Sequence, residues 1–197
     1  KSINQYYNKE NARLQSIKDK QNYGKKTTLR QKRLSLKHNN KANDYMNKTA
    51  RIIIDYCIDH DIGKLIIGYN EDFQRNANIG KTNNQIFTNI PFGKLRDKLK
   101  YLCEFNDIEY IPVEESYTSK ASFFDYDDIP VYTKEKTSLY IFSGKRIHRG
   151  MYETMNGYTF NADVNGALNI LKKSNVVSLE ALYARGVVDT PMRIRMA

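Results

Sequence analysis

The sequence predicts an α/β domain preceded by a basic helical segment. Residues 61–117 contain an apolar strand, an amphipathic helix and a second apolar strand in that order. This order is typical of a βαβ unit with parallel strands. Residues 1–60 lack proline and place apolar side chains at helical spacing. The same residues hold 14 Lys and Arg against 5 Asp and Glu, which is most of the net charge of +10.

Length and composition exclude several classes of protein. A chain of 197 residues with 40% hydrophobic residues is long enough for one compact domain with an appended segment, and too apolar to be disordered. No apolar run approaches the ~18–20 residues of a membrane span. Two cysteines exclude a disulfide scaffold and a four-cysteine zinc site. No signal peptide opens the chain, so we expect a cytoplasmic protein. The start lacks Met and reads as the middle of a helix, so we expect a piece of a longer polypeptide.

The location of the positive charge favours a polyanionic partner. Basic side chains gathered on one element bind nucleic acid because each neutralised phosphate releases counterions. The alternative is a solvated helix pair whose charges only confer solubility. An anionic membrane surface is less well supported, since the apolar residues here do not form one strongly apolar face.

The basic segment reads as two helices. The first covers residues 1–22 and ends at Tyr23-Gly24. The second runs from about 28 to 60, with an interruption expected near Asn39-Asn40. Its later half places apolar residues on one face, which predicts a buried Cys57 without a catalytic role. The residues of this face are Met46, Ala50, Ile53, Ile54, Cys57 and Ile58.

The βαβ unit follows directly. Residues 64–69 form the first strand, and the helix begins after Pro91, a normal residue at a helix start. Residues 108–113 form the second strand, which ends at Glu114-Glu115. We expect residues 118–157 to be irregular, residues 158–161 to form a short strand, a helix to follow Asp163, and the tail from 175 to be weakly structured.

Two carboxylates stand where chemistry is expected in such a fold. Glu115 follows a core strand and Asp163 opens a helix, and ligand sites form at the carboxyl ends of parallel strands. Converging carboxylates suit Mg²⁺, and two such ions about 4 Å apart would clamp the reacting oxygens of a phosphodiester. Alternatively, Asp163 only caps its helix and Glu115 is an ordinary surface acid. Spacing alone leaves both interpretations open.

Five segments together resemble the C-terminal half of the OrfB/TnpB family of insertion-sequence proteins, relatives of type V CRISPR effector nucleases. They are Lys1-Ser2-Ile3-Asn4-Gln5-Tyr6-Tyr7-Asn8-Lys9, Ile67-Gly68-Tyr69-Asn70, Asn84-Gln85-Ile86-Phe87 with Ile90-Pro91-Phe92, Glu115-Ser116-Tyr117-Thr118-Ser119-Lys120, and Asn161-Ala162-Asp163-Val164-Asn165-Gly166-Ala167-Leu168-Asn169-Ile170-Leu171. The resemblance covers roughly residues 1–175, and the last two motifs are specific in combination.

The resemblance implies a partial RNase H/RuvC-like domain of an RNA-guided DNA endonuclease, with guide RNA and target DNA as partners. In that family three carboxylates hold two Mg²⁺ ions. Asp163 matches the last of them. The usual Glu at the end of the first strand is Gly68 here, and Glu115 takes its place, with Glu114 and Glu71 as alternatives. The basic helices would contact nucleic-acid backbones, best through Lys25, Lys26, Arg30, Lys32, Arg33 and Lys37.

Two departures from the family pattern bear on function. The family's four-cysteine zinc finger corresponds to residues 121–157, which contain no cysteine, so zinc is not expected. Aromatic residues are expected to form a small apolar cluster there instead, namely Tyr126, Tyr132, Tyr140, Phe142, Tyr152 and Tyr158. The family's first catalytic Asp lies upstream of the segment that Lys1 begins, so no residue of this chain matches it. Two ligands alone should hold Mg²⁺ poorly.

The resemblance divides the chain into five parts. They are the basic helical segment 1–60, the strand-helix-strand core 61–117, the cysteine-free counterpart of the zinc finger 118–157, the last RuvC motif with its helix 158–174, and the tail 175–197. Three functions remain open: the C-terminal part of a RuvC-type nuclease, a catalytically inactive nucleic-acid-binding remnant or regulator, and a conventional DNA transposase.

Overall fold

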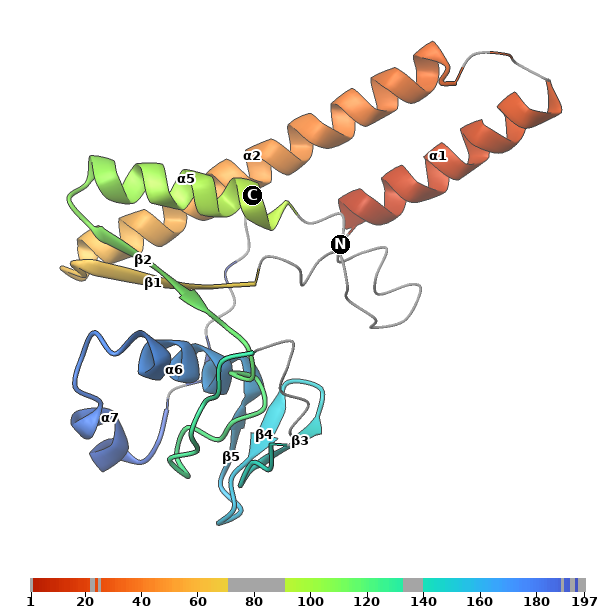
Figure 1. The fold of residues 1–197 in the computed structure, drawn as a ribbon. Coiled ribbons are helices and arrows are strands. Elements are labelled where there is room, and N and C mark those ends of the chain that lie inside the picture. The colour runs from red at the N-terminus through yellow and green to blue at the C-terminus, as the bar shows by residue number, and fades with distance from the viewer. Residues whose placement is uncertain are drawn as a thin grey trace. The chain divides into compact units, whose positions relative to one another are not determined.

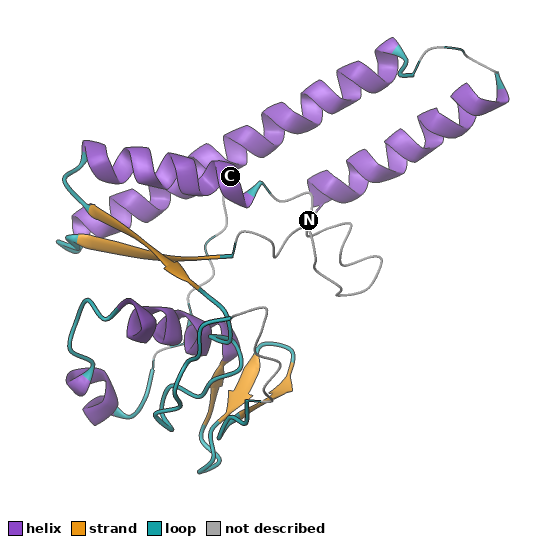
Figure 2. Ribbon diagram, in the orientation of Figure 1, coloured by secondary structure: helices purple, strands orange, loops and turns teal. Residues whose placement is uncertain are grey.

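The computed structural model describes residues 2–21, 24, 26–70, 91–132, 140–188, 190, 191 and 194. These residues form two compact units, shown in Figure 1 and, by secondary structure, in Figure 2. The first unit contains the described residues up to Ile62 and those from Pro91 to Asp107. The second contains residues 63–70 and the described residues from Ile108 onward.

The first unit consists of the helices α1 (Ser2–Lys20), α2 (Leu29–Asp59) and α5 (Phe92–Phe105). A capping box opens α2. The Gln31 backbone N–H donates to Thr28 Oγ1 at 3.1 Å, and the Thr28 N–H donates to Gln31 Oε1 at 2.9 Å. These two bonds satisfy backbone donors that the first turn would otherwise leave unpaired.

The predicted interruption of the second helix near Asn39-Asn40 is wrong, since α2 is continuous. Asparagine costs a helix at most about 0.7 kcal/mol per residue relative to alanine. Packing against α1 offsets that cost: Tyr7 and Ser35 share a hydrogen bond of 3.1 Å, and His38 hydrogen-bonds Asn4 at 2.9 Å.

The core of the first unit lies between its helices. Its buried residues include Leu14, Met46, Ala50, Ile54, Cys57, Leu99 and Cys103. The predicted burial of Cys57 is confirmed, whereas Ile58, expected on the same face, is 48% exposed. Burial raises the pKa of both thiols, that of Cys103 to about 11, so both cysteines stay protonated core residues.

The second unit begins with the predicted parallel pair, β1 (Lys64–Tyr69) and β2 (Glu109–Glu114). The register runs from Lys64↔Glu109 to Tyr69↔Glu114, so the carboxyl ends of both strands lie at one edge. The Glu115 N–H extends the ladder by donating to the Tyr69 carbonyl at 3.1 Å. The predicted parallel pairing is therefore confirmed.

Residues 118–157 are more regular than predicted. They contain β3 (Lys145–His148) and β4 (Met151–Glu153), which form an antiparallel sheet with β5 (Thr159–Asn161). Each strand has only three or four residues, too few for a clear period of two. The turn between β3 and β4 uses Gly150 at φ +84°, a conformation that suits glycine.

The helix α6 (Ala162–Ser174) follows β5 directly. Its N-cap is Asn161, whose Oδ1 accepts from the backbone N–H of Asp163 at 2.8 Å and of Val164 at 3.1 Å. The interpretation of Asp163 as the cap is therefore wrong. A short helix, α7 (Glu180–Arg185), was not predicted; its Tyr183 ring stacks on Phe123 and Tyr126.

The aromatic cluster expected in the cysteine-free segment forms in part. Tyr152 is buried with Phe160, and Tyr158 packs against them. Tyr126 and Tyr132, also expected in the cluster, are 62% and 59% exposed. Tyr140 and Phe142 instead pack on Tyr117.

Two aspartates tie the loops of this segment together. The Asp127 carboxylate accepts from the Ser122 N–H at 2.7 Å and from Ser143 Oγ at 2.6 Å. The Asp125 carboxylate accepts from the Ser122 hydroxyl at 2.5 Å and from the Met155 N–H at 2.9 Å. Hydrogen bonds to carboxylates thus join stretches of chain up to 30 residues apart.

Candidate active site

Glu115 lies at the edge where β1 and β2 both end, in the space that a side chain at position 68 would need. A Cβ placed on Gly68 would lie 2.7 Å from Glu115 Oε2 and 2.6 Å from Ile170 Cδ1 of α6. Both distances are below van der Waals contact, so a side chain at position 68 would require the ends of the Glu115 and Ile170 side chains to shift. The carboxylate therefore stands over the end of β1 although it belongs to the chain after β2.

Asp163 lies in the first turn of α6, with 88% of its side chain exposed. Its negative charge is favourable there because of the helix dipole. Asp163 and Ile170 are seven residues apart, close to two helical turns, so both lie on one face of α6 with about 10 Å of helix between them. Gly166 lies between them on that face, and its Cβ position has no atom within 4 Å.

The structure thus places both predicted ligands on the same side of α6, Glu115 beside Ile170 and Asp163 two turns earlier. Within the described ranges, no three His, Cys, Asp or Glu side chains lie close enough together to hold a metal ion. Glu71, one of the alternatives, lies outside the described residues.

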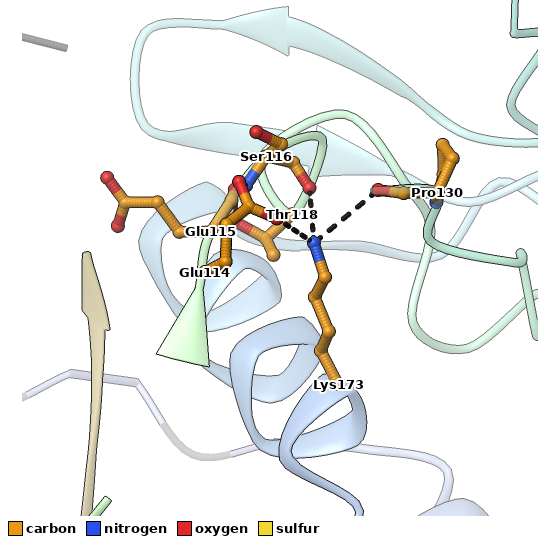
Figure 3. A network of polar contacts seen from close by, with 6 residues as sticks. All are labelled: Glu114, Glu115, Ser116, Thr118, Pro130 and Lys173. Carbon is orange, nitrogen blue, oxygen red and sulfur yellow. Dashed lines mark hydrogen bonds and ion pairs between the residues drawn. The ribbon is translucent and has the colours of Figure 1, made fainter. Parts of the chain in front are cut away.

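Glu114 has a different environment from its neighbour (Figure 3). Its carboxylate accepts from Lys173 Nζ at 2.5 Å and from the Ser116 N–H at 2.6 Å. Lys173 is largely buried and also donates to the carbonyls of Ser116, at 3.3 Å, and Pro130, at 3.4 Å. Glu115 points away from this network, as successive residues at a strand end do. Lys173 therefore neutralises Glu114 and holds it at the end of β2.

We expect the Glu114–Lys173 pair to make stability depend on pH. Burial opposes ionisation of Glu114, but hydrogen bonds from Lys173 and Ser116 outweigh it and lower the pKa below its ordinary value of 4.5. The contribution of ionised Glu114 to folding stability is therefore fully present above about pH 4.5 and is lost as the pH falls through the lowered pKa. Glu114→Gln should lower the free energy of unfolding by about 2 kcal/mol at pH 7. The loss of stability between pH 7 and pH 3, measured by urea unfolding, should be smaller in this variant than in the wild type. An equal loss in both proteins would show that the Glu114–Lys173 pair does not cause this pH dependence.

Two asparagines of the last motif hold the Tyr-Thr-Ser segment on α6. The Asn165 amide donates to the Ala121 carbonyl at 2.8 Å, and its Oδ1 accepts from the Phe123 N–H at 3.1 Å. The Asn169 amide donates to the carbonyls of Thr118, at 2.9 Å, and Ala121, at 2.7 Å. Both side chains are fully buried. Their role was not predicted, although a spacing of four residues places them on one face of a helix.

The predicted nucleic-acid contacts lie on and just before α2. Lys25 is outside the described residues, and the other five are exposed. Arg30, Arg33 and Lys37 form a stripe at spacings of three and four residues, and Lys32 lies on another face. Lys41, which was not predicted, lies one helical turn beyond Lys37 on the same stripe. Lys41, Lys37 and Tyr6 line a cavity of about 320 Å³.

These cations form no close ion pair within the described part of the chain, although the charge of Arg30 helps Arg13 to lower the pKa of Glu10. Arg30, Lys32, Arg33 and Lys37 have no carboxylate within 4 Å there. Further along α2, by contrast, Lys48 pairs with Asp44 at 3.3 Å and Arg51 with Asp55 at 2.9 Å. The early half of α2 therefore presents unpaired positive charge.

Comparison with known proteins identifies the family. The model OrfB_IS605, described as "Probable transposase", matches residues 1–74, and the model of the Cas12f1-like TNB domain matches residues 92–170. Together they cover both basic helices, both strands of the parallel pair and all of the last motif except its final residue. The chain belongs to the OrfB/TnpB family. No match was found among curated proteins.

The fold of this OrfB/TnpB protein is also found in a solved structure, "Cryo-EM structure of the Cas12f1-sgRNA-target DNA complex". The identity is 20% and the TM-score 0.55, over 87% of this chain and 41% of that one. The chain therefore spans less than half the length of that protein. The likeness confirms an α/β, partial RuvC-like fold. Among the described helices of the OrfB/TnpB protein, none is both long and apolar enough to cross a membrane.

Proposed function

We propose that this chain is the C-terminal part of an RNA-guided, Mg²⁺-dependent DNA endonuclease. The observation that carries the proposal is the placement of Glu115 over Gly68, beside the α6 face that carries Asp163. A carboxylate thereby stands at the end of β1, where the family resemblance expects a glutamate. The Cas12f1 structure, whose title names a guide RNA and target DNA, supports nucleic-acid partners of the same kind.

Glu115 and Asp163 would hold the metal. Both offer carboxylate oxygens, the ligands that Mg²⁺ prefers, and the empty space at Gly166 leaves their side of α6 accessible. Bound Mg²⁺ would supply the positive charge that lowers the pKa of an attacking water and stabilises the leaving oxygen. The Glu114–Lys173 pair would fix the backbone at the end of β2, and so the direction of Glu115. The third carboxylate of the family has no counterpart in this chain.

Cleavage of a guide-matched DNA by the protein–RNA complex tests the proposal. Glu115→Gln and Asp163→Asn should each lower the cleavage rate about 10³-fold, equivalent to about 4 kcal/mol, with DNA binding retained. Glu109→Gln is the matched control, because Glu109 is an exposed carboxylate at the opposite end of β2. Cleavage at the normal rate by the Glu115→Gln/Asp163→Asn double variant would show that the site is wrongly assigned.

The cationic stripe of α2 is proposed to contact nucleic-acid backbones. Replacing Arg30, Arg33 and Lys37 together by Gln should weaken binding and lower the slope of log K against log salt by about 3. Lys48→Gln/Arg51→Gln should change the slope much less, because Asp44 and Asp55 already neutralise these cations. Equal slopes for the wild type and the triple variant would rule out the stripe as the binding surface.

The same experiments distinguish the proposed endonuclease from the two alternatives, an inactive nucleic-acid-binding protein and a conventional DNA transposase. An inactive binding protein would show salt-dependent binding without Mg²⁺-dependent cleavage. A conventional transposase would yield strand-transfer products in addition to hydrolysed ends.

A further inference from the structure

We propose that the cavity between α1 and α2 binds one unpaired nucleotide of the guide RNA, with the base stacked on Tyr6 and the phosphate held by Lys37 and Lys41. This inference deepens the nucleic-acid contact proposed for the cationic stripe and rests on it. The two helices lie side by side (Figure 1). The cavity has a volume of about 320 Å³, which is within the range of small-molecule sites.

Helical spacing brings the lining side chains together. Lys41 of α2 follows Lys37 and His38 by four and three residues, so these side chains lie on one face of the helix. Tyr6 and Tyr7 line the cavity from α1. None of the described residues that line it is a carboxylate, so an anionic ligand would meet no opposing charge there.

The aromatic side of the cavity is fixed around Tyr7 and exposes the ring of Tyr6. Tyr7 and His38 stack with their ring centroids 4.3 Å apart. The Tyr7 hydroxyl shares a hydrogen bond of 3.1 Å with Ser35, and His38 Nε2 hydrogen-bonds Asn4 Oδ1 at 2.9 Å. Tyr6, by contrast, is 65% exposed. An exposed tyrosine ring offers a stacking face for an unpaired base of any kind.

The charge of the cavity favours a phosphate. Lys37 and Lys41 are exposed, and neither has a carboxylate within 4 Å in the described ranges. Like charges four residues apart destabilise a helix, so folding does not account for this pair of lysines. Lys37 also belongs to the stripe that begins at Arg30 and Arg33. A strand whose phosphates follow the stripe would therefore reach the cavity.

An unpaired RNA nucleotide matches both features, because it joins a flat ring to a phosphate. The base must be unpaired, since paired bases are stacked inside their own helix and present no free face. Folded RNA offers such bases in its loops and bulges, whereas target DNA is a duplex until it is opened. A free nucleotide would make no use of Arg30 and Arg33, the cations that continue the contact along α2.

Binding of two RNA hairpins by the full chain tests the proposal. One hairpin has a single bulged 2-aminopurine, a fluorescent base whose emission falls on stacking, and the other has an abasic bulge at the same place. The wild type should bind the first about tenfold more tightly and quench its fluorescence. Tyr6→Leu should abolish both effects, because leucine keeps the helix but lacks the ring. Tyr6→Phe should retain both. Lys41→Gln should lower the slope of log K against log salt by about 1 for both hairpins.

Tyr56→Leu is the matched control and should keep the tenfold preference. Tyr56 is 52% exposed, also stacks on a histidine, His60, at 3.9 Å, and lies about 22 Å beyond Lys41 along α2. Equal binding of both hairpins by the wild type, or a preference that survives in Tyr6→Leu, would overturn the proposal while leaving the stripe intact. A wild type that binds neither hairpin would refute the stripe as well. Tighter binding of the same bulged hairpin made of DNA would overturn the assignment to RNA.

Discussion

Moving the carboxylate from position 115 to position 68 is expected to restore cleavage that each single change abolishes. Gly68→Glu alone places a Cβ 2.6–2.7 Å from Ile170 and from the Glu115 carboxylate, so it should be inactive and destabilised. Glu115→Ala alone removes the proposed ligand and should lower the rate about 10³-fold. In the double variant, truncation at 115 removes the contact with the Glu115 carboxylate, and the flexible end of the Ile170 side chain can shift to remove the other. The rate should then recover by about 10²-fold over either single variant.

The control for this exchange is Gly68→Gln/Glu115→Ala, which has the same shape without the charge and should remain inactive. Thermal unfolding of all four variants separates loss of a ligand from loss of the fold. A double variant Gly68→Glu/Glu115→Ala that unfolds like the wild type and yet fails to cleave would refute the placement of a metal ligand at the end of β1.

Tyr152→Ala is expected to cause the largest loss of stability in the second unit, about 3–5 kcal/mol. Tyr152 is 1% exposed, packs on Phe160, and donates its hydroxyl to the Lys120 carbonyl at 2.7 Å. Gly144 lies so close to the ring that its Cβ position is 2.6 Å from Tyr152 Cε1. Tyr152→Phe should cost only about 1 kcal/mol, because it removes the hydrogen bond and keeps the ring.

Urea unfolding followed by tyrosine fluorescence measures these differences. Tyr132→Ala is the control, since an exposed residue should change stability by about 0.5 kcal/mol at most. Because hydrogen bonds to Asp125 and Asp127 join the loops of this segment, a zinc chelator should leave the transition of the wild type unchanged. A chelator-induced loss of stability would show that a metal supports the segment after all.

Local patterns in the sequence were sufficient for the framework. The period of apolar residues located α2 and α5, and the order of strand, helix and strand predicted the parallel pairing of β1 with β2. Where local preference and packing disagreed, at Asn39-Asn40, packing prevailed and the prediction was wrong. The short strands β3 and β4 were missed because three or four residues carry too little periodicity.

The sequence by itself determined the helices α1, α2, α5 and α6, the parallel strand pair, the concentration of cations on α2 and the two candidate carboxylates. Only the tertiary structure decided what surrounds those carboxylates. Glu115 fills the space beside Gly68, Lys173 neutralises Glu114 from 59 residues away, and Arg146 faces Asp163. Helical and strand periodicity act over a few neighbouring residues, whereas these contacts join segments that meet only once the second unit has folded.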